Sequence, residues 1–211
     1  MSDEHPLLAA WRAGDAEAGE ALFERFYDAL SRFFRSKAGD GAPDLIQRTF
    51  LVMLETHTRM REGTTFQAYL FGIARKVLLE HYRNRRRDGE RFDPVEQSFE
   101  DLGPTPTGLL AGVQETQLLL QALRRIPLES QMILELYFWE NVTAREIGDV
   151  FEAPEGTVRT RIRRAKQQLR DQIAVLAATP ALLESTLSDL ESWAVRLREE
   201  LVIKVRGQAV R

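Results

Sequence analysis

The sequence contains no cysteine, and this absence excludes several classes of protein. Structural disulfides, thiolate zinc sites, iron–sulfur clusters and cysteine nucleophiles all need thiols. The three histidines, His5, His57 and His81, are scattered, and neither an H-E-x-x-H motif nor a phosphate-binding glycine loop occurs. Spacing reveals no paired carboxylates either, so we expect no enzyme, no cofactor and no metal site.

Long apolar runs are also missing. The N-terminal MSDEHPLLAAWRAGD is acidic and polar, whereas a secretory signal needs a basic start and an unbroken apolar core. No stretch reaches the roughly 18 apolar residues of a membrane-spanning helix. We therefore expect a cytoplasmic protein that does not insert into a membrane.

An excess of positive charge is lacking too. The net charge is −3 and the isoelectric point is about 5.8, which argues against a protein that coats nucleic acid through bulk charge. The 211 residues, 44% apolar and 29% charged, have an ordinary globular composition for one domain or two small ones. Any contact with nucleic acid must therefore be local.

Apolar residues recur at helical spacing over most of the chain, with no β-alternation and no internal repeat. Three or four helices are expected before residue 88, with breaks at GDGAP (39–43) and EGTT (62–65). Residues 92–116 hold three prolines, three glycines, five acids and no basic residue, which is typical of a flexible linker. The sequence predicts an all-α chain with a helical domain (1–90), an acidic linker (91–116), a second helical domain (117–176) and a C-terminal extension helix (177–211).

Basic residues concentrate in two segments, one in each domain. Residues 75–91 hold seven basic residues against three acids, and residues 155–171 hold six against two. Either run alone could equally be a solvated helix face or a helix end that complements the helix dipole. Two such runs on two tethered domains favour a protein that holds DNA at two places.

Residues 143–170 have the order expected of a helix-turn-helix. Thr143 can cap a first helix, and Glu146 stands at the third position after it, as a capping box requires. Ile147 and Val150 would form the buried face of this helix. The predicted turn covers residues 151–154, where Pro154 cannot continue the first helix but suits the start of the next.

The second helix of this motif has two faces. Its expected buried positions are Val158, Ile162, Ala165 and Leu169. Arg159, Thr160, Arg163 and Arg164 project from the other side, where a recognition helix reaches base edges in the major groove. The alternative is a helical hairpin with an arginine-rich exposed face, which would need the cap, the turn and the buried valine to coincide with that face by chance.

Three blocks of sequence together resemble the extracytoplasmic-function (ECF) sigma factors of the sigma-70 family. They are DLIQRTFLVMLE (44–55), FQAYLFGIARKVLLEHYRNRRR (66–87) and LRRIPLESQMILELYFWENVTAREIGDVFEAPEGTVRTRIRRAKQQL (123–169). The resemblance implies an RNA polymerase sigma factor for promoter recognition and transcription initiation, responding to a stress or envelope signal. Its domains would be a sigma region 2-like domain and a region 4-like helix-turn-helix domain.

The resemblance also implies partners and binding residues. Core RNA polymerase would be bound through the clamp helices of its largest subunit by Asp44, Leu45, Gln47 and Phe50, of which we expect Leu45 or Phe50 to be a core residue instead. Promoter DNA would be read at the minus-thirty-five element by Arg159, Thr160, Arg163, Arg164 and Lys166. An anti-sigma factor is a further expected partner, with control by the C-terminal helix as the intramolecular alternative.

The minus-ten element would be read by the loop and helix around residues 61–87. The residues expected there are Arg61, Thr64, Thr65, Lys76, His81, Tyr82, Arg83 and Arg86. The loop would capture a flipped base, which costs a few kcal/mol of unstacking. Most aromatics nearby, such as Phe66 and Phe71, are expected in the core, whereas His81 and Tyr82 beside the arginines should face DNA.

This sequence departs from the family pattern at one position and from the usual helix-turn-helix pattern at two. Lys76 stands where many relatives have asparagine, and a lysine can hold a phosphate but cannot make the paired contacts of an amide to a base. The resemblance therefore does not extend to the minus-ten preference. Gly148 stands where alanine is common, and Glu152 stands where glycine often supplies a left-handed turn, so strain is expected at Glu152.

Two questions stay open on sequence alone. A stand-alone helix-turn-helix regulator is the main alternative, but such a protein should carry a ligand pocket or a phosphoacceptor domain, which residues 44–87 do not indicate. The extension carries a leucine and tryptophan seam from Leu182 to Leu201 at helical spacing. This seam could pack on its own domain, on a partner or second copy, or across both domains.

Overall fold

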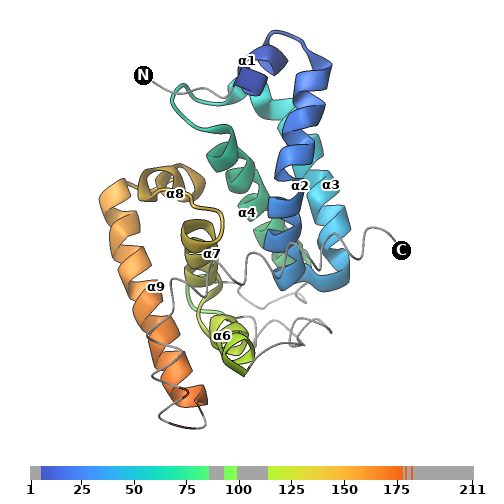
Figure 1. Cartoon of the computed structure of the whole chain (residues 1–211). Coiled ribbons are helices and arrows are strands. Elements are labelled where there is room, and N and C mark those ends of the chain that lie inside the picture. The colour runs from blue at the N-terminus through green and yellow to red at the C-terminus, as the bar shows by residue number, and fades with distance from the viewer. Residues whose placement is uncertain (1–5, 86–92, 99–113, 178, 180–181, 183–211) are drawn as a thin grey trace. The chain divides into compact units, whose positions relative to one another are not determined.

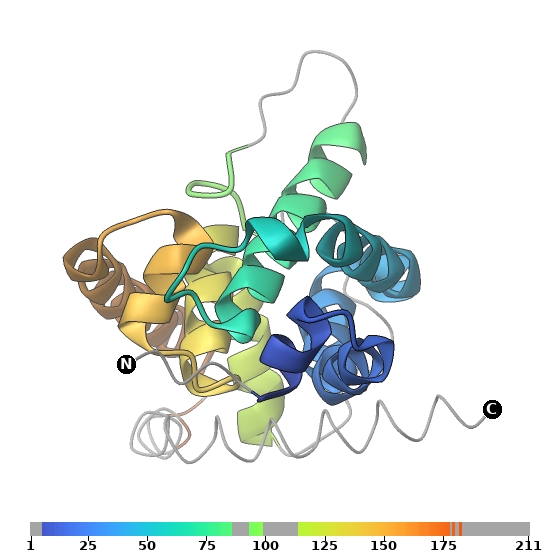
Figure 2. The ribbon, with the colours of Figure 1, turned by 90° about the horizontal axis from the view of Figure 1, so that it is seen from above.

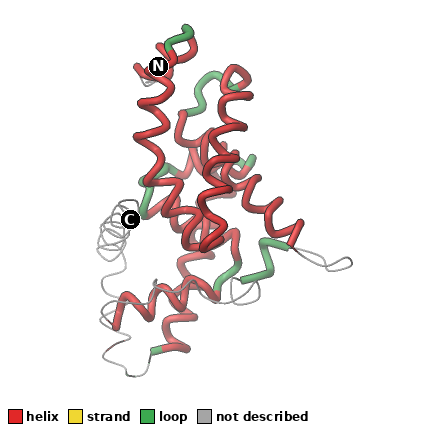
Figure 3. The backbone as a smooth tube through the Cα atoms, turned by 90° about the vertical axis from the view of Figure 1, so that its right-hand side faces the viewer, coloured by secondary structure: helices red, strands yellow, loops and turns green. Residues whose placement is uncertain are grey.

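The computed structural model describes residues 6–85, 93–98, 114–177, 179 and 182. Within these ranges every extended regular element is a helix, and the one β-like contact is an isolated bridge between Ser98 and Pro127 (Figure 3). The all-α prediction is confirmed. The predicted extension helix lies almost entirely outside the described residues, and so do most of the linker and Arg86.

The chain divides into two compact units. The first comprises Met1–Arg85 and Val142–Glu155, and the second comprises Arg86–Asn141 and Gly156–Arg211. The first unit therefore takes in a short segment that follows the linker. That segment, Val142–Glu155, contains the first helix of the predicted helix-turn-helix.

The first unit is a bundle of four N-terminal helices with one added helix. Its elements are α1 (Pro6–Arg12), α2 (Ala16–Ala38), α3 (Ala42–Thr56), α4 (Phe66–Arg85) and α8 (Ala144–Phe151), with short 3-10 turns at Gly39–Gly41 and His57–Arg59. Helices α2, α3 and α4 pack against one another, α1 covers α2, and α8 packs on α4 (Figure 1, Figure 2). The predicted break at 39–43 is confirmed, and the second break is wider than expected because α3 ends at Thr56.

Aromatic side chains fill much of this bundle. Phe34 and Phe71 are fully buried, and the ring of Phe33 contacts that of Phe71 edge-on with centroids 5.6 Å apart. Trp11 of α1 stacks on His57 at 4.1 Å. Such pairs add to the free energy gained by burying apolar area, so the bundle is held as a rigid support for its exposed faces.

The second unit is built from α6 (Gln114–Arg125), α7 (Leu128–Phe138) and most of α9 (Glu155–Leu176). One apolar cluster joins these helices: Leu118, Leu119, Ala122, Leu123, Ile126, Leu134, Trp139, Ala165, Leu169 and Ile173. Two polar contacts fix α9 against α7, from Arg161 to Glu129 at 2.6 Å and from Ser130 to Gln168 at 2.7 Å. The unit thereby holds α9 by one face and leaves the other face exposed.

Gly148 shows how tightly α8 meets the turn that follows it. A Cβ atom at this position would lie 2.6 Å from the carbonyl oxygen of Ala153, which is closer than such atoms approach in folded proteins. Packing therefore favours glycine at this position, although glycine lowers the helix propensity of α8. Gly156, in the first turn of α9, has no atom within 4 Å of a Cβ built there.

These two glycines give a matched prediction for stability. Gly148→Ala should lower the free energy of unfolding by about 1–3 kcal/mol, because the turn must shift to admit the methyl group. Gly156→Ala should leave it unchanged or raise it by up to about 1 kcal/mol through helix propensity. Urea unfolding of both variants measures the difference, and equal effects at the two positions would contradict the close approach.

Candidate DNA-binding and polymerase-binding surfaces

The first helix of the helix-turn-helix is closed by a capping box at its N-terminus. The hydroxyl oxygen of Thr143 accepts a hydrogen bond from the backbone N–H of Glu146 at 3.3 Å, and the Glu146 carboxylate accepts one from the Thr143 N–H at 2.9 Å. Burial opposes ionisation of Glu146, but hydrogen bonds from Thr143 and Thr65 and the nearby Arg145 outweigh it and lower the pKa of this carboxyl. The predicted cap is confirmed.

The turn is held in a strained conformation at Glu152. The backbone of this residue adopts the left-handed helical conformation, with φ 53° and ψ 44°. The N–H of the next residue, Ala153, donates a hydrogen bond to the carbonyl of Gly148 at 2.9 Å. A left-handed conformation costs a residue with a Cβ roughly 1–2 kcal/mol compared with glycine. The expected strain is confirmed, and the turn is one residue shorter than predicted because α8 extends to Phe151.

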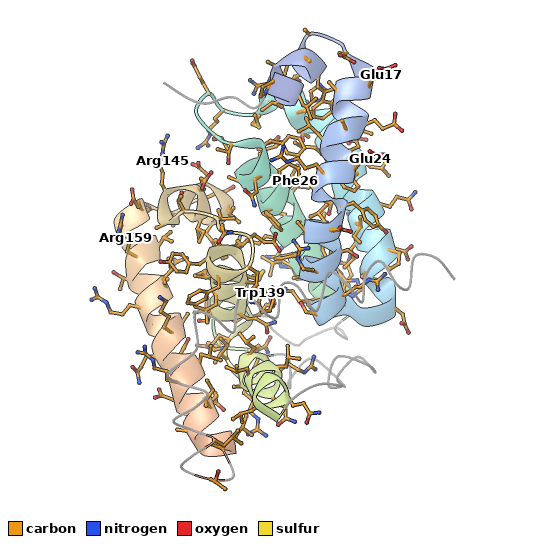
Figure 4. All side chains as sticks on the ribbon, viewed as in Figure 1. Glu17, Glu24, Phe26, Trp139, Arg145 and Arg159 are labelled. Atoms are coloured by element: carbon orange, nitrogen blue, oxygen red, sulfur yellow. The ribbon has the colours of Figure 1, made fainter. Side chains whose placement is uncertain are left out.

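Helix α9 divides into the two faces predicted from the sequence. Its buried positions are Val158, Ile162, Ala165 and Leu169. Its exposed positions include Arg159, Thr160, Arg163 and Arg164, and Figure 4 shows Arg159 projecting from the N-terminal part of the helix. Lys166 differs from them, since it is half-buried with its ammonium over the rings of Tyr137 and Phe138, 5.0 and 4.7 Å from the centroids.

Helix α3 presents an exposed face that the sequence identified only in part. Asp44 and Gln47 are exposed, whereas Leu45 is buried and the ring of Phe50 packs on that of Phe23 with centroids 4.6 Å apart. Both apolar residues of the expected docking set thus contribute to packing within the bundle. Their exposed surface is correspondingly small.

Two leucines on the same helix were missed. Leu51 and Leu54 are 52% and 46% exposed, and they continue the line of Asp44 and Gln47 at helical spacing. Neither leucine was among the residues expected to bind the polymerase. The signal was their register, since both lie off the buried stripe of Leu45, Thr49 and Met53.

The residues expected at the minus-ten element fall into three groups. Arg61, Lys76 and Arg83 are exposed, and Arg86 lies outside the described part of the chain. Thr64 and Thr65 are half-buried, and the Thr65 hydroxyl accepts from the N–H of Ala68 at 3.2 Å at the start of α4.

Tyr82 requires a correction. It is 6% exposed, and its hydroxyl donates a hydrogen bond to the carbonyl of Lys37 inside the bundle. The neighbouring His81 is half-buried, with its ring edge-on to that of Tyr82 at 5.5 Å. Because a buried tyrosine needs a partner for its hydroxyl, this ring serves the core and not the DNA-facing surface that we expected.

The described residues show neither a metal-binding cluster nor a membrane-spanning helix. In those ranges no group of three or more histidine, aspartate and glutamate side chains could hold a metal ion. No helix of the described chain combines the length and apolarity needed to cross a membrane.

Comparison with known proteins identifies the two halves of the chain. Residues 22–88 match the family description Sigma-70 region 2, and residues 116–169 match Sigma-70, region 4. The ECF RNA polymerase sigma factor BldN of Streptomyces coelicolor is 30% identical over 173 residues, which cover 77% of this chain and 63% of that one. The chain belongs to the ECF sigma factors of the sigma-70 family. It is therefore a sigma factor for transcription initiation, and the stand-alone regulator is not favoured.

Other relatives of this sigma factor agree. The RNA polymerase sigma factor HrpL of Pseudomonas syringae pv. syringae is 28% identical over 146 residues, covering 66% of this chain and 77% of that one. Two solved structures share the fold. The sigma factor RpoE in complex with the anti-sigma factor NepR, from Bartonella quintana, has a TM-score of 0.55 at 21% identity over 76% of this chain and 98% of that one. The structure of CnrH in complex with the cytosolic domain of CnrY has a TM-score of 0.59 at 19% identity, and the match covers 81% of this chain and 97% of that one.

Proposed function

We propose that this sigma factor binds core RNA polymerase through the exposed face of α3 and reads promoter DNA with two separate surfaces. The minus-ten element would meet the loop before α4 and the exposed basic residues of that helix. The minus-thirty-five element would meet Arg159, Thr160, Arg163 and Arg164 on α9. The observation that carries this proposal is the exposed arginine face of α9, opposite a fully packed apolar face in a region 4 helix-turn-helix.

The polymerase-binding part of the proposal rests on α3. Leu51 and Leu54 leave apolar area in water next to Asp44 and Gln47, and a pair of exposed leucines bordered by polar groups is typical of a protein-binding surface. We assign these four residues to the clamp helices of the polymerase. Leu45 and Phe50 would support the surface from beneath.

The proposal also covers the domain plan and the setting of the protein. Residues 1–90 would form the region 2-like domain, residues 91–116 the linker and residues 117–176 the region 4-like domain. Members of this family are generally not enzymes, and this chain would act as a binding subunit in the cytoplasm, where core polymerase is found. Because RpoE and CnrH were solved with NepR and CnrY, an anti-sigma factor that responds to a stress or envelope signal is a proposed partner.

The docking surface predicts a loss of polymerase binding on mutation. The native chain should bind core polymerase stoichiometrically without DNA, as a stand-alone regulator would not. Asp44→Ala with Gln47→Ala, and separately Leu51→Ala with Leu54→Ala, should each weaken binding by about 1–3 kcal/mol, as for residues central to an interface. Titration of labelled chain with core polymerase measures the affinity.

A matched control for this experiment lies on α2. Tyr27 is 42% exposed and is not part of the proposed surface, so Tyr27→Ala should leave the affinity unchanged. Native affinity in both double variants would rule out the docking assignment. Failure of the native chain to bind core polymerase would rule out the proposed function itself.

The recognition face predicts a loss of base specificity. Arg159→Ala or Arg164→Ala should weaken promoter binding by about 1–3 kcal/mol and relax the base preference at the minus-thirty-five element. Arg170→Ala, an exposed arginine in the last part of α9, is the control and should change specificity little. Binding of polymerase with each variant to promoter and random duplexes distinguishes the roles, because equal losses on both duplexes would show phosphate contacts only.

A further inference from the structure

Residues 93–98 of the predicted linker, which we call the anchor segment, lie against the start of α7. They fall outside both family matches, which cover 22–88 and 116–169, yet they belong to the second compact unit. Ser98 is 9% exposed and forms the isolated β-bridge with Pro127, the residue before α7. This part of the linker is therefore packed on the region 4 helices of its own unit.

The first turn of α7 finds hydrogen-bond acceptors in the anchor segment. A helix begins with N–H groups that have no partner within it, and an N-cap side chain usually accepts from one of them. The N-cap of α7 is Pro127, which makes no such bond. Instead, the N–H of Leu128 donates to the carbonyl of Gln97 at 2.8 Å, and the N–H of Glu129 donates to that of Pro94 at 2.9 Å. Leu128 is fully buried, so its N–H depends on this carbonyl and not on water.

Two side chains hold the anchor segment in the conformation that α7 needs. The Asp93 carboxylate accepts a hydrogen bond from the N–H of Val95 at 2.9 Å, and the side-chain oxygen of Gln97 accepts one from the N–H of Asp93 at 3.2 Å. The N–H of Gln97 donates to the carbonyl of Asp93 at 2.9 Å. Aspartate commonly stabilises a turn in this way. Asp93 and Gln97 therefore fix the positions of the two carbonyls that α7 uses.

The same turn of α7 also contacts the recognition helix. The Glu129 carboxylate, whose side chain is only 12% exposed, accepts from the Arg161 guanidinium at 2.6 Å. The Ser130 hydroxyl donates to the side chain of Gln168 at 2.7 Å. Arg161 stands within residues 159–164, the stretch of α9 proposed to read the minus-thirty-five element. A shift of the first turn of α7 would therefore move the part of α9 that meets bases.

We propose that the anchor segment is a positioning element for the minus-thirty-five reader, in which Asp93 and Gln97 fix the first turn of α7 and Glu129 holds Arg161 of α9. The inference rests on the proposed function, because it concerns the same face of α9. Asp93 and Gln97 act through α7 and are positioning residues. Base recognition needs donors and acceptors in exact register, whereas attraction to phosphate needs mainly charge. Loss of the anchor should therefore lower base discrimination and leave general DNA binding unchanged.

Hydrogen exchange in the free full-length protein tests the anchor segment itself. The amides of Leu128 and Glu129 should exchange slowly in the native chain. Asp93→Ala with Gln97→Ala should raise both exchange rates about two- to tenfold, the factor expected for the net loss of one hydrogen bond. The amide of Leu169, in the buried stripe of α9, should keep its native exchange rate, which shows that the unit stays folded.

Two matched controls lie in the same segment. Asp93→Asn keeps an acceptor oxygen for the N–H of Val95 and should retain native exchange at Leu128 and Glu129. Glu96→Ala removes an exposed side chain from the same turn and should also leave these rates unchanged. Together they separate the hydrogen bonds of the segment from its acidic charge.

Binding of polymerase with each variant to promoter and random duplexes tests the positioning role. The Asp93→Ala, Gln97→Ala double variant should lower the ratio of promoter affinity to random-duplex affinity about two- to tenfold, with random-duplex affinity unchanged. Glu129→Gln weakens only the pair with Arg161, so it should lower this ratio while the Leu128 amide stays protected. The two control variants should keep the native ratio.

The two measurements fail in different ways. Native exchange at Leu128 and Glu129 in the double variant would overturn the anchor. Faster exchange with a native affinity ratio, or an equal fall of the ratio in Glu96→Ala, would overturn the positioning role. Exchange is measured without polymerase or DNA. A native chain with protected amides but no preference for promoter would therefore overturn the proposed function, and the positioning role with it, while the hydrogen-bonded anchor would be upheld.

Discussion

The packing of α8 on α4 is the contact on which the first compact unit depends for its segment from beyond the linker. Helix α4 carries residues assigned to the minus-ten element, and α8 is the first helix of the helix-turn-helix. While the two helices touch, Lys76 is paired with Glu152 and Thr65 with Glu146. Two of the residues proposed to read the minus-ten element are thus tied to this contact.

Local features of the fold follow from the sequence, whereas the contact between α4 and α8 does not. The capping box of Thr143 and Glu146 and the buried stripe of α9 depend on residues a few positions apart, so spacing alone predicts them. Lys76 and Glu152 are distant in the sequence, and Lys76 was visible only as a departure from the family pattern and Glu152 only as a departure from the usual helix-turn-helix pattern. Their pairing needed the tertiary structure, because no periodicity links residues on different helices.

Aromatic and apolar residues explain the other differences. Tyr82 stands beside arginines in the sequence, but the bundle buries its ring and Lys37 supplies a backbone carbonyl for its hydroxyl. On α3 the reverse holds, since Leu51 and Leu54 are exposed although leucine usually belongs to a core. Residue type alone misassigned Tyr82 and left the two leucines out of the expected polymerase-binding set. The register of each helix against its buried stripe gives the correct face for the leucines.

The central claim is that this chain binds core polymerase and directs it to a promoter, and run-off transcription tests it most directly. With purified core polymerase, the native chain should support promoter-dependent run-off transcription, and Arg159→Ala with Arg164→Ala should reduce it at the same promoter. Native transcription by that double variant, or no promoter-dependent transcription with the native chain, would contradict the account.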